Sequence, residues 1–182
     1  MKVLLTILFL ILTTGCSSKS YYTLGDSITI ESKDNYTENI AVVSVIVPKY
    51  LEEFKLVRQT SPYHVEIINK AHWLTPMQKR LTNLLIDYLQ QSMNNPNVHL
   101  YPWESNSKDK IRVSLRIKKF IAFNNDVILK ANYKILDLQN NTTKSKLFET
   151  AIKTDGSLDG MIHSMETAYL ELVINIKNNI MK

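Results

Sequence analysis

Two long stretches of alternating apolar and polar residues constrain the fold of this chain most strongly, one over residues 111–118 and one over residues 127–135. Alternation with a period of two predicts strands that have one buried face and one solvated face. Residues 123–126 are predicted to form a hairpin turn between them, and a third strand is expected around residues 144–154. The positions expected to be buried are Ile111, Val113, Leu115, Ile117, Val127, Leu129, Ala131, Tyr133 and Ile135.

Shorter strands are predicted earlier in the chain. Residues 40–47 form a β-branched run that ends at Pro48, which predicts a strand buried on both faces. Residues 56–58 and 63–67 are expected to pair with each other, and residues 98–101 form a further short strand.

Two amphipathic helices complete the pattern. Thr75, followed by proline and then by Gln78, predicts a helix that Thr75 caps and that ends at residues 94–96. Ser157 is predicted to open a second helix. The apolar stripes of the two helices are Met77, Leu81, Leu84, Leu85, Tyr88 and Leu89, and Ile162, Met165, Tyr169, Leu172, Val173 and Ile176. We therefore expect an α+β fold, a mainly antiparallel sheet with two helices packed on one face.

The only cysteine, Cys16, follows a segment with the parts of an export signal: a positive start, an apolar run over residues 3–12 and a small-residue exit. The apolar run is much shorter than the roughly 20 residues that a membrane-spanning helix needs. Its ending on Gly15-Cys16 resembles the lipobox of bacterial lipoproteins, in which the cysteine receives a diacylglycerol. The expected organisation is a lipoprotein signal peptide (1–15), a lipidated tether (16–20) and a single periplasmic α+β domain (21–182).

The remaining composition disfavours several classes of function. The formal net charge is +5 and becomes +4 (5 − 1) once Lys2 is removed with the signal peptide, which is too weak and diffuse to favour nucleic-acid binding. No metal or other cofactor is expected, because the histidines, at positions 64, 72, 99 and 163, lack a metal-ligand spacing. Because no pattern of a nucleophile or a phosphate-binding loop is present either, we expect a protein that is not an enzyme.

One face of the predicted hairpin is a candidate docking surface. Arg112 and Arg116 share a face of the first strand, and Lys130 and Lys134 share a face of the second. This arrangement is either an ordinary solvated sheet face or a surface that binds an acidic partner or lipid headgroups. Two tryptophans, Trp73 and Trp103, are further candidates for partner binding.

Taken in order, several segments resemble the PqiC/YmbA family, the auxiliary lipoproteins of ABC-type, MCE-type transport systems. The resemblance rests on the lipobox with residues 21–24, on residues 45–51 with 56–58, on residues 72–76, on residues 101–103, and on the strand from Ile111 with Leu136-Asp137.

The resemblance implies a location and a set of partners. It implies an outer-membrane lipoprotein that faces the periplasm, anchored in the inner leaflet, which docks a periplasm-spanning MCE protein that works with an inner-membrane protein to move lipid. Ser17 after the cysteine favours outer-membrane sorting within this resemblance. By analogy with a symmetric MCE tube, the chain would form a homo-oligomer. The alternative is a lipoprotein plug or assembly factor of an outer-membrane β-barrel, such as the lipopolysaccharide translocon.

Overall fold

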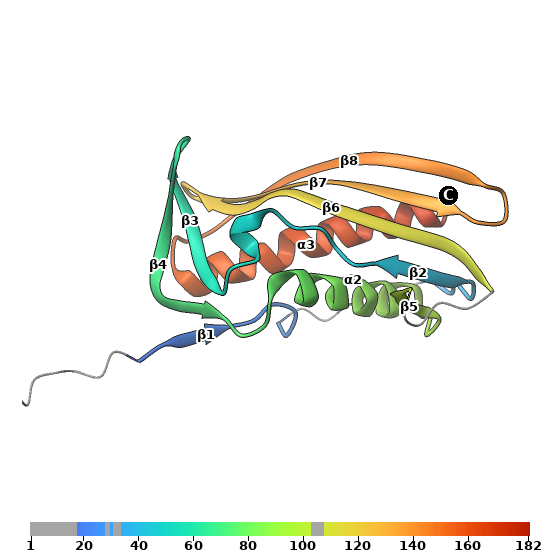
Figure 1. Cartoon of the computed structure of the whole chain (residues 1–182), viewed down its shortest axis with the longest axis horizontal. Helices are drawn as coiled ribbons and strands as arrows, with labels where there is room; N and C mark the ends of the chain where they lie inside the picture. Colours follow the sequence, from blue (N-terminus) through green and yellow to red (C-terminus); the bar gives the residue numbers. More distant parts are fainter. Residues whose placement is uncertain (1–17, 28–29, 31–33, 103–107) are drawn as a thin grey trace, which may run out of the picture.

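In the computed structural model, which describes residues 18–27, 30, 34–102 and 108–182, two α-helices cover one face of an eight-stranded sheet (Figure 1). The strands are β1 (Ser20–Tyr22), β2 (Asn39–Val43), β3 (Lys55–Ser61), β4 (His64–Trp73), β5 (Val98–Tyr101), β6 (Asp109–Phe123), β7 (Asp126–Asp137) and β8 (Thr142–Lys153). The helices are α2 (Met77–Met93) and α3 (Leu158–Ile180), with a short 3-10 helix η1 (Lys49–Leu51). The predicted α+β class is confirmed.

The sheet is built around β6. On one side, β6, β7 and β8 form two long antiparallel ladders. On the other side, the first part of β6 pairs with β2 and its last residues pair with β3, both in parallel. Beyond these strands lie β5 on one branch, and β4 and β1 on the other. The sheet is therefore mixed but mostly antiparallel, with short parallel ladders only beside β6, β2 and β4 within the described residues.

The alternation predicted for β6 and β7 is confirmed. All nine residues expected to be buried are at most 5% exposed. A register shift between Ile117 and Lys119 inserts an extra residue into β6, and a bulge of this kind redirects the side chains that follow it. Phe120 is consequently fully buried, and its backbone N–H donates to Tyr50 Oη at 2.8 Å.

The apolar run over residues 40–47 is only partly a strand. Strand β2 ends at Val43, and Ile46 forms a single parallel bridge with Arg116 of β6. Val45 and Val47 are buried, whereas Ile46 is 44% exposed. The prediction of one strand buried on both faces is therefore wrong. In the last part of the run, Val45 and Val47 face the core while Ile46 between them faces solvent.

Helix α2 begins one residue later than the sequence predicts. Its N-cap is Pro76, with an extended ψ of 127°, and no side chain caps it. The predicted Thr75 cap is wrong, because the extended Pro76 separates Thr75 from the first helical turn. The predicted apolar stripe is buried throughout, and Asn94 ends the helix with a left-handed φ of 46°.

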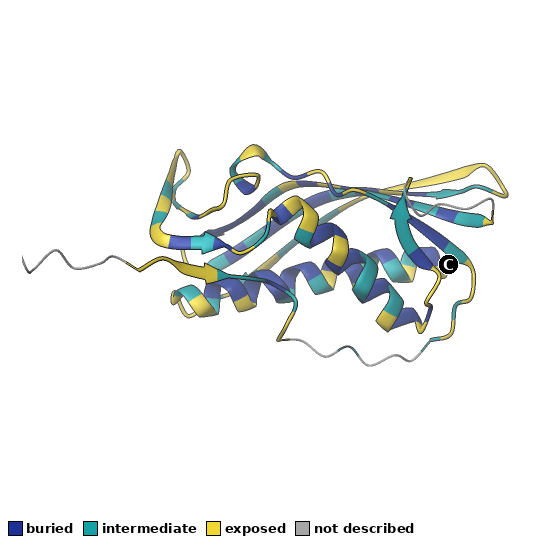
Figure 2. Ribbon diagram, turned by 60° about the horizontal axis from the view of Figure 1, so that its bottom comes forward, coloured by how far each residue is buried: buried dark blue, intermediate teal, exposed yellow. Residues whose placement is uncertain are grey.

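Helix α3 begins as predicted, with Ser157 Oγ accepting from Gly160 N at 2.9 Å. Its buried stripe packs between the sheet and α2, and Figure 2 shows the buried residues concentrated between the layers. Tyr169 Oη donates to the carbonyl of Leu81 at 2.6 Å, which joins the two helices inside the core. In the described part of the chain, none of the helices has the length and apolarity to cross a bilayer.

Two glycines with positive φ give a matched pair for a stability prediction. A Cβ at Gly25 (φ +94°) would lie 2.1 Å from Leu84 Cδ2 of α2, whereas a Cβ at Gly156 (φ +83°) would meet nothing within 4 Å. Gly156→Ala should cost about 1–2 kcal/mol through backbone strain alone. Gly25→Ala should cost roughly 1–3 kcal/mol more, because it also overpacks the core. Denaturant melts of the two variants measure this difference, and equal losses would contradict the close packing of Gly25 on α2.

Candidate functional site

The predicted cations lie on the sheet face that the helices leave uncovered, which we call the outer face. Arg116 of β6 pairs with Asn132 of β7, so Lys130 and Lys134 are its diagonal neighbours. Diagonal positions on adjacent antiparallel strands are about 7–8 Å apart, within reach of long side chains. The fold therefore brings Arg116, Lys130 and Lys134 together, with Arg112 four residues before Arg116 on β6.

Two of the four cations have partners within the fold. Lys130 Nζ lies 2.6 Å from Glu149 Oε1 on β8. The guanidinium of Arg112 lies 3.9 Å from the ring centre of Tyr101 on β5, and the Arg112 side chain is half-buried. The expectation that Arg112 projects into water is therefore wrong, because the aromatic ring covers it. Arg116 and Lys134 remain as exposed cations.

The outer face also carries polar atoms that lack a partner. Asn132 Oδ1 and Arg112 Nε are buried, and neither has a hydrogen bond to any of the described residues. Buried polar atoms in folded proteins are nearly always bonded, and leaving one unpaired is costly. Because both atoms have almost no accessible surface, this cost is internal to the fold, and neither atom can bond a partner that docks on the outer face.

The other predicted site residues do not join this surface. Trp73 is 3% exposed and packs in the core at the end of β4. Its position therefore does not support a role in partner binding. Trp103 and Cys16 lie outside the described residues.

Sequence reasoning missed a polar cluster that ties the segment after β1 to α3. Ser27 Oγ donates to Glu166 Oε2 at 2.5 Å, and Ser27 N donates to Glu166 Oε1 at 3.2 Å. Tyr88 Oη also reaches Glu166 Oε1, at 3.3 Å, and burial together with this carboxylate raises the pKa of Tyr88. His163 Nδ1 is 3.5 Å from Ser27 Oγ.

This cluster has the residue types of a nucleophilic triad but not the arrangement. In a triad the imidazole accepts the serine proton and the carboxylate orients the imidazole. Here Glu166 bonds the serine directly, and it is 3% exposed. The cluster therefore holds a loop against α3. No local sequence signal could have found it, because 139 residues separate Ser27 from Glu166.

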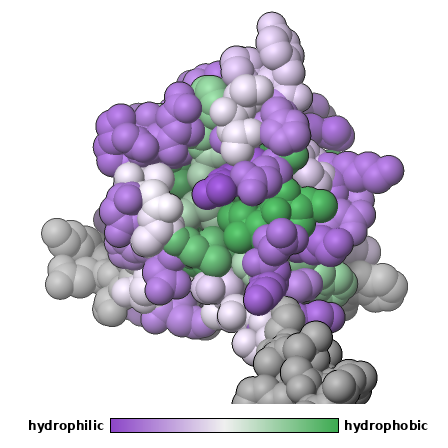
Figure 3. Space-filling model, turned by 90° about the vertical axis from the view of Figure 1, so that its left-hand side faces the viewer, coloured by the Kyte–Doolittle hydropathy of each residue, from purple (hydrophilic) through white to green (hydrophobic). Residues whose placement is uncertain are grey.

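One end of the domain exposes apolar side chains around the β3–β4 hairpin. Tyr63 at the hairpin turn is 99% exposed, and Val65 and Ile67 of β4 are 46% and 49% exposed. Figure 3 shows apolar side chains gathered in the middle of this end, with hydrophilic residues around them. We call this surface, made of Tyr63, Val65 and Ile67, the apolar end.

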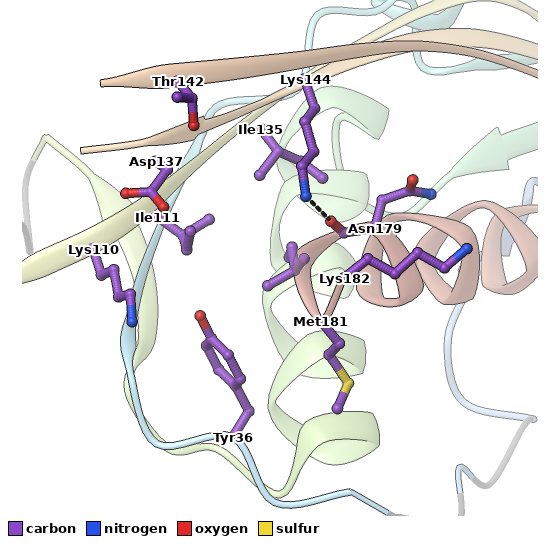
Figure 4. A pocket seen from close by; sticks show the side chains of 11 residues that line it. Tyr36, Lys110, Ile111, Ile135, Asp137, Thr142, Lys144, Asn179, Met181 and Lys182 are labelled. Carbon is purple, nitrogen blue, oxygen red and sulfur yellow. Dashed lines mark hydrogen bonds between the residues drawn. The ribbon is translucent and has the colours of Figure 1, made fainter. Parts of the chain in front are cut away.

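The opposite end, where α3 finishes, contains a cavity of about 340 Å³ (Figure 4). Its walls include Ile111, Ile135 and Ile180, and Lys110 and Lys144 lie among its polar lining residues. The two amines already have partners: Lys110 Nζ is 3.0 Å from Glu38 Oε1, and Lys144 Nζ donates to the carbonyl of Asn179 at 3.5 Å. Lys144 thereby stabilises the negative end of the α3 dipole.

Asp137 and Tyr36, which also line this cavity, interact with the surrounding fold in ways that shift their pKa values. Hydrogen bonds from the backbone and side chain of Asn140 hold the pKa of Asp137 below its usual range, and burial raises the pKa of Tyr36. Among the described residues, no three histidine, aspartate or glutamate side chains gather as a metal site would require. The groups in this cavity stabilise the end of the fold.

Comparison with known proteins gives one family and several similar folds. The model of a family described as the ABC-type transport auxiliary lipoprotein component matches residues 22–177. The crystal structure of an uncharacterized protein matches with a TM-score of 0.75 and 20% identity, over 90% of this chain and 99% of that one. A Xanthomonas campestris protein from the DUF330 family matches with a TM-score of 0.71 and 11% identity, over 86% and 92%. These structures show the fold alone, and no curated protein matches this chain.

Proposed function

Because the chain belongs to the family of ABC-type transport auxiliary lipoprotein components, we propose that it docks the periplasm-spanning MCE component of an intermembrane lipid transport system to the outer membrane. The family match over residues 22–177 carries this proposal, since it covers α2, all but the last three residues of α3, and the strands from β2 to β8. The proposed role is that of a binding module with no catalytic step of its own.

The proposed attachment to the membrane is a lipid on Cys16. In this proposal residues 1–15 are removed during export, and residues 16–20 tether one periplasmic domain, residues 21–182, to the inner leaflet of the outer membrane. Four peptide units from Cys16 to Ser20 span at most about 14 Å. The domain would therefore work close to the bilayer surface.

The proposed docking surface for the MCE component is the outer face. Its exposed cations, Arg116 on β6 and Lys134 on β7, suit an acidic partner surface. Arg112 and Lys130 already have intramolecular partners. In the proposed interface they would contribute to shape complementarity more than to charge attraction.

Reversing the two exposed charges tests this surface. Arg116→Glu with Lys134→Glu should weaken capture of the MCE protein about tenfold at low salt, because two attractions become repulsions worth up to about 1 kcal/mol each. The loss should shrink at high salt, where exposed charges are screened. The measurement is a binding titration against the purified MCE protein, with folding checked by circular dichroism.

A matched control reverses two positive charges at positions away from the outer face. Lys79 lies exposed on α2, and Lys182 lies beyond α3, both away from the outer face. Lys79→Glu with Lys182→Glu should leave capture unchanged. If both double variants bind as the wild type does, or lose affinity equally, the outer face is not the docking surface.

A further inference from the structure

The apolar end is not explained by the packing of the domain. Val57 of β3 pairs with Ile67 of β4, and Gln59 pairs with Val65, so Val57, Val65 and Ile67 share one face of the hairpin. Later in β4, past Lys70 with its positive φ of 67°, Ala71 and Trp73 are buried in the core. The irregular register therefore gives β4 a buried end and an exposed apolar end, and the exposed side chains contribute little to the core.

The start of the described chain lies beside the same strand. Strand β1 pairs in parallel with the last residues of β4, Ser20 opposite Ala71, at the end of the molecule that carries the hairpin (Figure 1). Cys16 is within about 14 Å of Ser20. Ile67 lies four residues from Ala71, about 13 Å along a strand. A lipid on Cys16 would therefore hold a bilayer within reach of the apolar end.

The residues of this hairpin suit the membrane interface. Tyrosine is enriched at the level of the lipid headgroups, where its ring is buried and its hydroxyl stays hydrated. The hairpin strands carry three basic residues, Lys55, Arg58 and Lys70, against one acidic residue, Glu66, which forms an ion pair with Arg58 at 3.1 Å. Basic residues close to a surface are attracted to anionic headgroups.

We propose that the β3–β4 hairpin is a second membrane contact, in which Tyr63, Val65 and Ile67 rest in the headgroup region of the bilayer that holds the lipid anchor. This inference rests on the lipidation of Cys16 proposed above. It fixes the orientation of the domain: the hairpin faces the membrane, and the cavity at the end of α3 points away from it. The outer face is then perpendicular to the bilayer and open to a partner from the side.

Tryptophan reporters test this contact in the full lipidated chain. Tyr63→Trp places a reporter on the apolar end, and Leu147→Trp places one at a position that is 78% exposed on the outer face of β8. Each variant is reconstituted into vesicles of phosphatidylethanolamine and phosphatidylglycerol with brominated acyl chains, which quench nearby tryptophan. After the wild-type emission of Trp73 and Trp103 is subtracted, Tyr63→Trp should lose at least half of its emission and Leu147→Trp should lose almost none.

The other outcomes overturn the inference. Equal quenching of the two reporters would place the domain flat on the bilayer, and no quenching of Tyr63→Trp would remove the hairpin from the membrane. The emission of Tyr63→Trp could instead shift to the blue only when more copies of the chain are placed on each vesicle, without quenching by brominated lipid. That result would make the apolar end an interface between copies of the chain. No MCE protein is present, so failure here is separate from failure of docking, and the mass of the mature chain reports lipidation independently.

Discussion

Cys16→Ala is expected to remove the chain from the membrane fraction almost completely. The thiol is the proposed attachment point of the lipid, and each methylene buried in a bilayer contributes about 0.8 kcal/mol, so two or more acyl chains give an anchor that does not dissociate on a cellular timescale. Without the thiol, the exported domain has only the weak contacts of its surface to hold it at a membrane. The measurements are membrane fractionation and the intact mass of the mature chain, which should begin at a lipidated Cys16.

The control for this variant is Ser18→Ala, two residues further along the tether, which should leave both lipidation and fractionation unchanged. An alternative result for Cys16→Ala is retention of the uncleaved leader, which the intact mass detects and which still agrees with a lipoprotein signal. A wild-type chain that incorporates no labelled palmitate would contradict the lipoprotein organisation itself.

Leu85→Ala is expected to give a large loss of folding stability. Leu85 is fully buried in the middle of α2, inside the core between the helices and the sheet. Truncating a buried leucine leaves a cavity and costs roughly 2–5 kcal/mol. Because a whole domain is stable by only about 5–15 kcal/mol, this loss should shift the denaturant midpoint clearly.

The matched control on the same helix is Gln91→Ala. Gln91 is exposed, so its truncation should change the midpoint by less than about 0.5 kcal/mol. Similar small losses for Leu85→Ala and Gln91→Ala would contradict the packing of α2 against the core.

The parts of the fold that the sequence predicted well depend on long, regular patterns. The alternation in β6 and β7 determines which side chains of these strands are buried, independently of how the other strands pair. The apolar stripes of α2 and α3 determine the buried faces of the helices in the same way. The start of α2 was predicted wrongly because its position depends on a single residue. Thr75 and Pro76 both suit a helix start, and the extended ψ of Pro76 gives the cap position to the proline.

The candidate site was predictable only in part, because its members are joined by distant pairings. The alternation placed Arg116 and Lys134 on a solvated face, and their exposure agrees with it. The partners of the other two cations could not be inferred: Glu149 opposes Lys130 through the register of β7 and β8, and Tyr101 comes from β5 on the opposite side of β6. The same holds for the apolar end, since the exposure of Val65 and Ile67 follows from the irregular pairing of β3 with β4.

The most direct test of the central claim is a flotation experiment with both proteins. Vesicles carrying the lipidated chain are mixed with the detergent-solubilised MCE protein of the same organism and centrifuged through a density gradient. Our account predicts that the MCE protein rises with these vesicles and stays at the bottom with vesicles that lack the chain. If the MCE protein stays at the bottom in both cases, while the lipidated chain captures an outer-membrane β-barrel protein, the account is contradicted and the chain is a barrel plug or assembly factor.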